Sequence, residues 1–340
     1  MELTFNYRPY RRRFLQSLRT GHGKWAVREG VLVRVSDEAG RAGLGEMAPL
    51  AVFGTETLET SVQFCREREG RINSEEIDLI PEELPCCRFA CEEAYRAYAG
   101  AMEGEADSSR ELPVAALLPA GGEALEVLPE VLARGFSVIK WKIGVYPHRE
   151  EMECFFRLME RIPQGVNVRL DGNGALTRSA AETWITEGAK AGVEFLEQPL
   201  PPPEVDALLE LARDGSLRLA LDESVASLWE LRRWLDRGWP GLFVIKPALT
   251  GSFGDFQSVI RQLGSPDSFV FSSVFETKVG MKAALAWAFS FSEKSFSPRA
   301  LGFGTGGAFG DGLSPVLFPT IRWRDVEDWN LDAVWAEVGS

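Results

Sequence analysis

The chain has 340 residues, 45% of them hydrophobic, which suffices for one large domain or two ordinary ones with substantial cores and argues against disorder. Its 50 Asp and Glu residues outnumber 37 Lys and Arg residues, and the charge of −13 repels phosphate backbones, so nucleic acid is disfavoured as a partner and an acidic soluble enzyme is favoured. The segment MELTFNYRPYRRRF is charged throughout, and no apolar run approaches the roughly 20 residues that span a bilayer, so we expect a cytosolic protein without membrane contact.

Residues 1–110 predict an α+β domain. The stretch REGVLVRVSDEAGRAGLGEMAPL indicates two strands around the turn EAGR, and PCCRFACEEAYRAYAGAME indicates a helix that begins after Pro85. The tail, residues 311–340, contains short proline-bounded strands and tryptophans, and we expect it to pack back on this first domain.

Five cysteines, an odd number, occur in a chain without secretory features: Cys65, Cys86, Cys87, Cys91 and Cys154. We interpret them as reduced, buried thiols. Cys87 and Cys91 are four residues apart and can share a helix face, so metal binding is the alternative, but the histidines, His22 and His148, are distant in sequence.

Residues 111–310 alternate short apolar runs with longer amphipathic stretches, which predicts a parallel sheet covered by helices. The runs are LPVAALLP, FSVIKWKIG, VNVRLDGN, VEFLEQPL, LRLALDES, LFVIKPAL and SFVFSSVFE. A doubly wound sheet and a barrel both fit this alternation, but no glycine-rich dinucleotide motif follows the first run. The (β/α)8-type barrel is favoured because polar residues lie near the carboxyl ends of successive runs, where a barrel gathers its active site. These residues are Lys142, Asp171, Glu197, Asp222, Lys246, Ser272 and Ser273.

Three carboxylates recur at nearly one β/α unit each. Asp171 and Glu197 are 26 residues apart, and Glu197 and Asp222 are 25 apart. Taken singly, each has a structural explanation in a turn, a loop or a helix cap. Three carboxylates at one barrel mouth repel one another unless a cation bridges them, and oxygen ligands favour Mg²⁺ or a similar divalent ion. The regular spacing therefore predicts a metal site with positions left for water and substrate.

Lysines flank these carboxylates along the chain. Lys142 lies one run before Asp171, and Lys246 lies one run after Asp222, so a closed barrel would place the two lysines across the metal from each other. Strand alternation puts Lys140 on the same side as Lys142. A lysine with a lowered pKa can exchange a proton with the carbon next to a metal-bound carboxylate, and the metal would stabilise the resulting enediolate. The structural alternatives are a snorkelling strand-end lysine and an ordinary ion pair.

The motifs IKWKIG, RLDGNG, FLEQPL, ALDES and IKPALTGSFGD together resemble the enolase superfamily, muconate lactonizing enzyme subgroup, and GLGEMAPL at 43–50 is similar to the signature of its capping domain. Members of that superfamily pair a Lys or His base with Mg²⁺. Within the subgroup, KPALTGSFGD, FSSVFETKVGM and LGFGTGG are most similar to the o-succinylbenzoate synthase family. N-acylamino acid racemases and dipeptide epimerases are the alternatives, but the epimerases typically carry an Asp-x-Asp motif where this chain has GFGTGG.

The resemblance implies a role for each residue, with the first domain as the capping domain. Asp171, Glu197 and Asp222 would bind Mg²⁺, or Mn²⁺, and the metal would bind the substrate's ring carboxylate. Lys142 would remove the alpha proton and protonate the departing hydroxyl, and Lys246 would stay cationic opposite it. Lys140 would tune the pKa of Lys142 and bind the substrate carboxylate. Arg169 and Asn173 would orient the metal ligands. The succinyl tail would be bound by Ser272, Ser273 and Gly302.

Two further expectations concern loops. The segment Arg19–Trp25, with glycines at 21 and 23, is a candidate lid over the barrel mouth. Gly304 stands where members of the resembled family often have an acidic residue.

Overall fold

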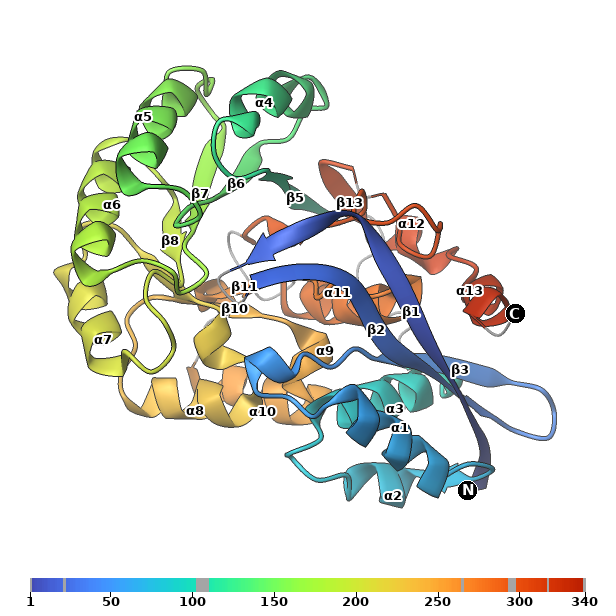
Figure 1. The fold of residues 1–340 in the computed structure, drawn as a ribbon. Coiled ribbons are helices and arrows are strands. Elements are labelled where there is room, and N and C mark those ends of the chain that lie inside the picture. The colour runs from blue at the N-terminus through green and yellow to red at the C-terminus, as the bar shows by residue number, and fades with distance from the viewer. Residues whose placement is uncertain are drawn as a thin grey trace.

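The computed structural model of the protein describes residues 2–20, 23–101, 110–263, 266–292, 298–316 and 318–338. Figure 1 shows an antiparallel sheet with helices at the amino-terminal end and a ring of parallel strands surrounded by helices. The predicted barrel and the α+β domain before it are both confirmed.

The first domain is a sheet in the order β3-β2-β1-β4, covered on one side by helices. Its strands are β1 (Glu2–Thr20), β2 (Gly23–Ser36), β3 (Ala42–Met47) and β4 (Ile72–Asn73); its helices are η1 (Ala51–Phe53), α1 (Leu58–Glu67), α2 (Ser74–Asp78) and α3 (Pro85–Tyr98). The predicted turn EAGR joins β2 to β3, and the predicted helix after Pro85 is α3. The cysteines of the described chain are buried free thiols.

Glycines bring α3 onto β3 at close range. A Cβ at Gly43 would lie 2.0 Å from the carbonyl oxygen of Ala94, and one at Gly45 would lie 2.0 Å from that of Ala90. The GLG part of the GLGEM motif is therefore required because the helix backbone occupies the space of a side chain.

Strands β5 to β12 form the barrel in chain order, with β12 hydrogen-bonded to β5 and a bridge between Ser272 and Gly302 closing the ring at β11 and β12. The strands are β5 (Glu111–Leu118), β6 (Val138–Lys142), β7 (Asn167–Asp171), β8 (Phe195–Glu197), β9 (Leu219–Leu221), β10 (Leu242–Ile245), β11 (Phe269–Phe271) and β12 (Leu301–Gly304). The outer helices are α4 (Glu123–Ala133), α5 (His148–Met159), α6 (Arg178–Lys190), α7 (Val205–Asp214), α8 (Leu228–Asp236), α10 (Phe253–Leu263) and α11 (Lys278–Ser292). Short helical turns are η2 (Glu223–Val225), α9 (Pro247–Thr250) and η3 (Pro266–Ser268).

The tail contacts both parts of the molecule. Its elements are β13 (Thr320–Arg322), α12 (Trp323–Glu327) and α13 (Leu331–Val338), and β13 pairs antiparallel with β5 of the barrel. Val334 of α13 packs against Tyr10 and Leu32 of the first domain. Arg12 of β1 forms a two-pronged ion pair with Asp311 at 2.7 and 2.8 Å.

A buried carboxylate joins the two domains. Glu46, at the end of β3, is fully buried and accepts hydrogen bonds from the backbone nitrogens of Thr277 (3.0 Å) and Gly280 (2.9 Å) at the start of α11. It also accepts from the hydroxyl of Tyr10 at 2.5 Å. An anion at a helix amino terminus satisfies unpaired N–H groups and the helix dipole together, so Glu46 fixes the first domain on the barrel.

Candidate active site

Strand β6 presents its lysines to the barrel interior. Lys140 and Lys142 alternate with Ile139 and Trp141, which are fully buried on the other side. The ring of Trp141 contacts the ring of Trp184 on α6, with centroids 6.1 Å apart. The apolar residues therefore face the helix layer, and the lysines face the interior and mouth, as strand alternation predicts.

The three predicted carboxylates lie on three adjacent strand ends. Asp171 and Glu197 are the last residues of β7 and β8, and Asp222 follows β9 directly. Lys142 pairs in register with Asp171, which pairs with Glu197. The three acidic residues are only 5%, 2% and 5% exposed, respectively. Buried carboxylates need a compensating charge, so this cluster requires cations.

Lysine ammonium groups supply that charge in this structure. The Nζ of Lys140 lies 2.9 Å from Oδ2 of Asp171 and 2.6 Å from Oε1 of Glu197, and Lys246 forms an ion pair with Asp222. Within the described ranges, no three Asp, Glu, His or Cys side chains lie close enough together to hold a metal ion. The donor set nevertheless fits a divalent cation, because the three buried carboxylates end adjacent strands, are each paired with a lysine ammonium group, and offer the oxygen atoms that hard cations prefer.

The two outer lysines face each other across the barrel. Lys142 ends β6 and Lys246 follows β10, and four steps separate these strands in the eight-stranded ring. Both side chains line one cavity. The Nζ of Lys246 also lies 4.7 Å from the centre of the Phe53 ring, a residue of the first domain. The sequence prediction of two lysines on opposite sides of the carboxylates therefore agrees with their placement.

Burial lowers the pKa of the two outer lysines, but not that of Lys140. It lowers the pKa of Lys142, and the nearby charge of Lys140 lowers it further against the opposing effect of Asp171. Burial lowers the pKa of Lys246 to about 7. For Lys140, burial acts in the same direction, but Asp171 and Glu197 outweigh it and raise the pKa above its ordinary value. Lys140 is therefore a permanent cation, whereas Lys142 and Lys246 release a proton more readily than exposed lysines.

The carboxylates also differ from one another. Burial acts to raise the pKa of Asp171, but Lys140 and Lys142 outweigh it and lower the pKa. Burial raises the pKa of Glu197, and Lys140 offsets this only in part. The neighbouring Glu223 has its pKa raised to about 7, first by burial and then by Asp171.

Gln198, Asn173 and Glu223 hold the strand ends in place. Oε1 of Gln198 accepts from the backbone nitrogens of Asp222 (2.9 Å) and Ser224 (3.2 Å). The backbone nitrogen of Asn173 donates to Asp171 at 3.1 Å, and its side chain donates to Glu223 at 2.9 Å. Asn173 thus contacts a predicted ligand. Gln198 and Glu223 received no role from the sequence, although both adjoin predicted ligands in FLEQPL and ALDES.

Arg169 lies away from the carboxylates. It is two residues before Asp171 on β7 and therefore faces the interior one layer deeper. Its guanidinium donates to Glu194 at 2.7 Å and to the backbone oxygen of Ala300 at 2.7 Å. The structure does not bring Arg169 into hydrogen-bond contact with the ligands it was expected to orient; it stabilises the amino-terminal end of the barrel.

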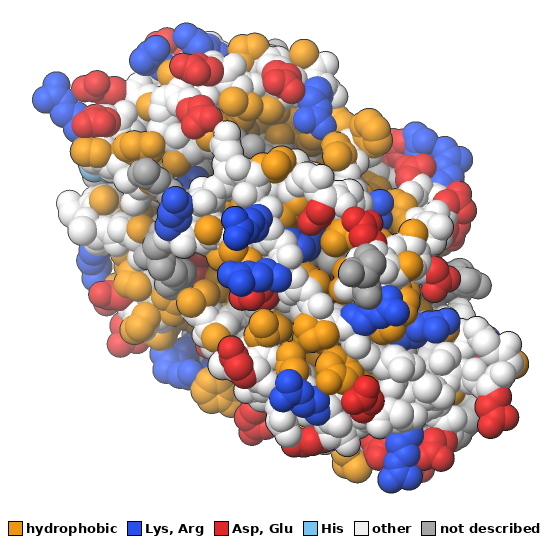
Figure 2. Space-filling view, turned by 45° about the vertical axis from the view of Figure 1, so that its right-hand side comes forward, with side chains coloured by type: hydrophobic (Ala, Val, Ile, Leu, Met, Phe, Trp, Pro, Cys, Tyr) orange, Lys and Arg blue, Asp and Glu red, His pale blue; other side chains and the backbone are white. Residues whose placement is uncertain are grey.

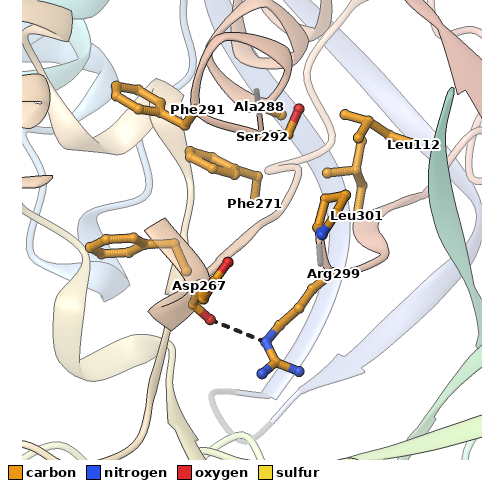
Figure 3. A pocket seen from close by; sticks show the side chains of 10 residues that line it. Leu112, Asp267, Phe271, Ala288, Phe291, Ser292, Arg299 and Leu301 are labelled. Carbon is orange, nitrogen blue, oxygen red and sulfur yellow. Dashed lines mark hydrogen bonds between the residues drawn. The ribbon is translucent and has the colours of Figure 1, made fainter. Parts of the chain in front are cut away.

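A small cavity of about 20 Å³ lies at that same end of the barrel. Figure 3 shows it lined by apolar side chains such as Leu112 and Leu301, with Arg299 donating to the backbone oxygen of Asp267 at 3.3 Å. It has room for about one water molecule. This cavity is too small for a substrate, so we place the candidate active site at the opposite end of the barrel, where the lysines and carboxylates lie.

The serines expected at the substrate tail use their hydroxyls within the protein. The hydroxyl of Ser272 donates to the backbone oxygen of Gly302 at 3.1 Å. The hydroxyl of Ser273 donates to Glu276 at 2.5 Å and accepts from Thr305 at 3.2 Å. All three expected tail residues, Ser272, Ser273 and Gly302, line the cavity, but neither hydroxyl has a proton left to offer a substrate carboxylate.

Gly304 leaves no room for an acidic side chain. A Cβ at this position would lie 2.3 Å from the carbonyl oxygen of Ala115 on the neighbouring strand. The close pairing of β12 with β5 therefore excludes an acidic side chain at this position.

The cavity above the lysines has a volume of about 1230 Å³ and reaches from the barrel mouth to the first domain. The first domain contributes residues of the β1–β2 hairpin, including Leu18 and Trp25, and of the segment 49–53. The backbone nitrogen of Leu15 donates to the oxygen of Ala308 at 2.9 Å, and Figure 1 shows the end of this hairpin beside the barrel. Residues 21 and 22 of the predicted lid lie outside the described residues; Leu18 and Trp25, on either side of them, line the cavity.

Comparison with known families identifies relatives of the chain. A family model described as enolase C-terminal domain-like matches residues 123–305. The o-succinylbenzoate synthase of Thermosynechococcus vestitus is 37% identical over 305 residues, which cover 89% of this chain and 92% of that protein. The o-succinylbenzoate synthase of Yersinia enterocolitica is 29% identical over 76% of this chain and 78% of that protein.

Solved structures agree with this result. The crystal structure of o-succinylbenzoate synthase from Thermosynechococcus elongatus BP-1, complexed with Mg in the active site, superposes with a TM-score of 0.84 at 34% identity and covers 98% of this chain and 100% of that one. The L-Ala-D/L-Glu epimerase from Bacillus subtilis superposes with a TM-score of 0.78 over 95% of this chain and 96% of that one. At 19% identity, the epimerase shows the shared fold alone.

Proposed function

The chain belongs to the o-succinylbenzoate synthase family of the enolase superfamily, and we propose that it dehydrates 2-succinyl-6-hydroxy-2,4-cyclohexadiene-1-carboxylate to 2-succinylbenzoate. The observation that carries this proposal is the arrangement of the barrel mouth: three buried carboxylates on adjacent strand ends, with a lysine on either side of them. In menaquinone or phylloquinone biosynthesis this reaction forms the aromatic ring.

Asp171, Glu197 and Asp222 are the residues that would hold Mg²⁺ or Mn²⁺. The position of the Lys140 ammonium between Asp171 and Glu197 supports this assignment, because it marks a place where two of the carboxylates already bind a cation. When bound, the divalent ion neutralises the charge that builds on the substrate carboxylate as the neighbouring proton leaves. The Mg in the Thermosynechococcus elongatus relative supports the same choice.

Lys142 moves the proton. Its lowered pKa makes the neutral amine accessible, and the amine takes the proton from the carbon that bears the ring carboxylate. The resulting ammonium then gives that proton to the hydroxyl on the neighbouring carbon, which departs as water while the ring becomes aromatic. One lysine serving both steps requires that proton and hydroxyl leave from the same face of the ring.

Lys140 and Lys246 supply positive charge. The charge is fixed at Lys140, whereas at Lys246 it depends on pH because burial lowers the pKa of that lysine to about 7. Lys246 faces the opposite side of the substrate, where the Asp222 carboxylate and the Phe53 ring stabilise its ammonium form. Lys140, held charged by two carboxylates, lies one layer below Lys142 and lowers the pKa of that lysine. Asn173 orients Asp171, and Gln198 orients Asp222.

The direct test is turnover by the purified protein in the presence of Mg²⁺. The cyclohexadiene absorbs in the ultraviolet differently from its aromatic product, so disappearance of its absorbance reports the reaction. Complete absence of turnover by the unaltered protein would overturn the proposal.

Racemisation of N-acylamino acids, or epimerisation of dipeptides, is a second candidate. The lowered pKa of both Lys142 and Lys246 favours it, since such reactions need a proton exchanger on each face. Solvent deuterium entering these substrates faster than the cyclohexadiene is dehydrated would establish it as the main activity.

The proposed partner is a small carboxylate substrate. No helix among the described residues is long and apolar enough to cross a membrane. Acidic and basic side chains are interspersed over the face shown in Figure 2. That nucleic acid is disfavoured stays a prediction from the net charge. A cytosolic location remains a prediction from the sequence.

A further inference from the structure

Backbone strain in the described ranges gathers at the barrel mouth. Apart from glycines, positive φ angles occur there at Asn173 (43°), Gln198 (33°) and Phe275 (63°). The first two follow β7 and β8 and hold carboxylates of the site, whereas Phe275 follows β11 and contacts none of these carboxylates. A bulky residue in the left-handed region persists only where its surroundings impose it, so the surroundings of Phe275 call for an explanation.

Glu276 imposes this conformation. It is only 1% exposed, and its Oε2 accepts from the hydroxyl of Ser273 at 2.5 Å and from the backbone nitrogen of Val274 at 2.7 Å. The hydroxyl of Ser273 in turn accepts from the backbone nitrogen of Phe275 at 3.0 Å. The carboxylate thus folds back over the turn formed by Ser273, Val274 and Phe275 and accepts two hydrogen bonds from it, while the Ser273 hydroxyl accepts a third from Phe275.

The turn is also tied to the first domain. Arg28 of β2, which is 2% exposed, donates from Nε to the backbone oxygen of Val274 at 2.9 Å. The ring of Phe275 meets Phe14 and Trp25 of the hairpin edge-on, with centroids 5.3 and 5.4 Å apart. The position of this ring is therefore fixed from both domains.

Phe275 lines the cavity at the strand ends that the catalytic groups leave free. Lys142, the three carboxylates and Lys246 occupy the ends of β6 to β10, which leaves β11, β12 and β5 to surround the rest of the substrate. In that arc, β12 offers Gly302 and Gly304, which have no side chains, while Phe275 and Leu117 supply apolar surface to the cavity. Because the hydroxyls of Ser272 and Ser273 already donate hydrogen bonds within the protein, the side chains of this arc offer the substrate apolar contact.

We propose that Phe275 is a specificity-determining residue that contacts the methylene groups of the succinyl arm, and that Glu276 is a positioning residue that holds it against them. This inference rests on the proposed function, which supplies a substrate with such an arm. Phe275 covers the arm from the β11 side, and Gly302 and Gly304 of β12 give the arm room to extend.

The test measures arm binding separately from turnover. In Phe275→Asn the ring is lost, but Asn tolerates the left-handed backbone; in Glu276→Leu both accepted hydrogen bonds of the turn are lost. Calorimetric titration in Mg²⁺ uses 2-succinylbenzoate, which has the arm, and benzoate, which lacks it. We expect either variant to weaken 2-succinylbenzoate binding by about tenfold or more and to leave benzoate binding unchanged, with KM raised and kcat retained.

Two matched variants serve as controls. Glu276→Gln keeps an oxygen acceptor for the turn and should bind 2-succinylbenzoate like the unaltered chain. Phe309→Leu disturbs the same aromatic cluster, since its ring stacks on Phe14 at 4.5 Å, but Phe309 is not among the residues that line the cavity and should not affect binding.

The outcomes separate the two proposals. Unchanged 2-succinylbenzoate binding in Phe275→Asn and Glu276→Leu, or equal losses for both ligands, would overturn this inference alone. An unaltered chain that binds 2-succinylbenzoate but shows no turnover would overturn the proposed function, and the binding comparison would still decide on Phe275. An unaltered chain that does not bind 2-succinylbenzoate would overturn both.

Discussion

Replacing Glu46 with alanine tests how the first domain is held on the barrel. The carboxylate is fully buried and accepts from two backbone nitrogens at the start of α11, those of Thr277 and Gly280, and from the hydroxyls of Tyr10 and Thr277. The backbone donors cannot turn away when the carboxylate is removed. Leaving a buried donor unpaired costs about 1–3 kcal/mol, so two of them predict a loss of roughly 2–6 kcal/mol in the free energy of unfolding.

Urea titration followed by tryptophan fluorescence measures this loss, and Tyr10→Phe provides the matched control. That variant removes one donor to the same carboxylate and leaves the backbone contacts intact, so it should cost only about 1 kcal/mol. If Glu46→Ala cost no more than Tyr10→Phe, the reasoning would be refuted, because the α11 contacts would then contribute nothing to stability.

Three further predictions concern packing, pH and metal binding. Gly43→Ala should lower the free energy of unfolding by several kcal/mol, because the new Cβ would lie 2.0 Å from the carbonyl oxygen of Ala94; an unchanged urea midpoint would contradict this. Burial raises the pKa of Glu93 from its ordinary 4.5 to about 7, so the folded state binds an extra proton between these values, and stability should fall as pH rises across that window by roughly 3 kcal/mol relative to Glu93→Gln. Parallel stability profiles of the two proteins from pH 4 to 8 would refute that assignment. Asp171→Asn should weaken Mg²⁺ binding at least about tenfold in a calorimetric titration, whereas Glu194→Gln, at the other end of the barrel, should not; equal effects would argue against the ligand assignment.

The parts of the site that the sequence predicts are those set by local periodicity. Alternation along β6 places Lys140 and Lys142 on one side, and the spacing of one β/α unit places Asp171, Glu197 and Asp222 on adjacent strand ends. Both rules depend on residues close together in the chain, so a single sequence is enough to apply them.

Other features depend on contacts between distant segments. Glu46 meets α11 across 231 residues, and no local pattern indicates that contact. Strand β12 does not form an apolar run, because Gly302 and Gly304 alternate with its apolar residues, and the close approach of these glycines to neighbouring strands is visible only in three dimensions.

The sequence also does not predict how deep in the barrel interior a side chain lies. Arg169 and Asp171 face the same interior, so alternation alone does not separate an arginine that orients ligands from one that pairs with Glu194 in the layer below. The hydrogen-bond partners of the Ser272 and Ser273 hydroxyls are likewise not predicted by the sequence. Their position at a strand end was predictable, but their use in internal hydrogen bonds was not.

The central claim is that Lys142 moves the proton in a dehydration at the mouth of this barrel. Its most direct test is the comparison of kcat for the cyclohexadiene substrate between the unaltered chain and Lys142→Ala, both with Mg²⁺. We expect turnover by the unaltered chain and a loss of about 10²–10⁴-fold in the variant. Full turnover by Lys142→Ala would contradict the claim.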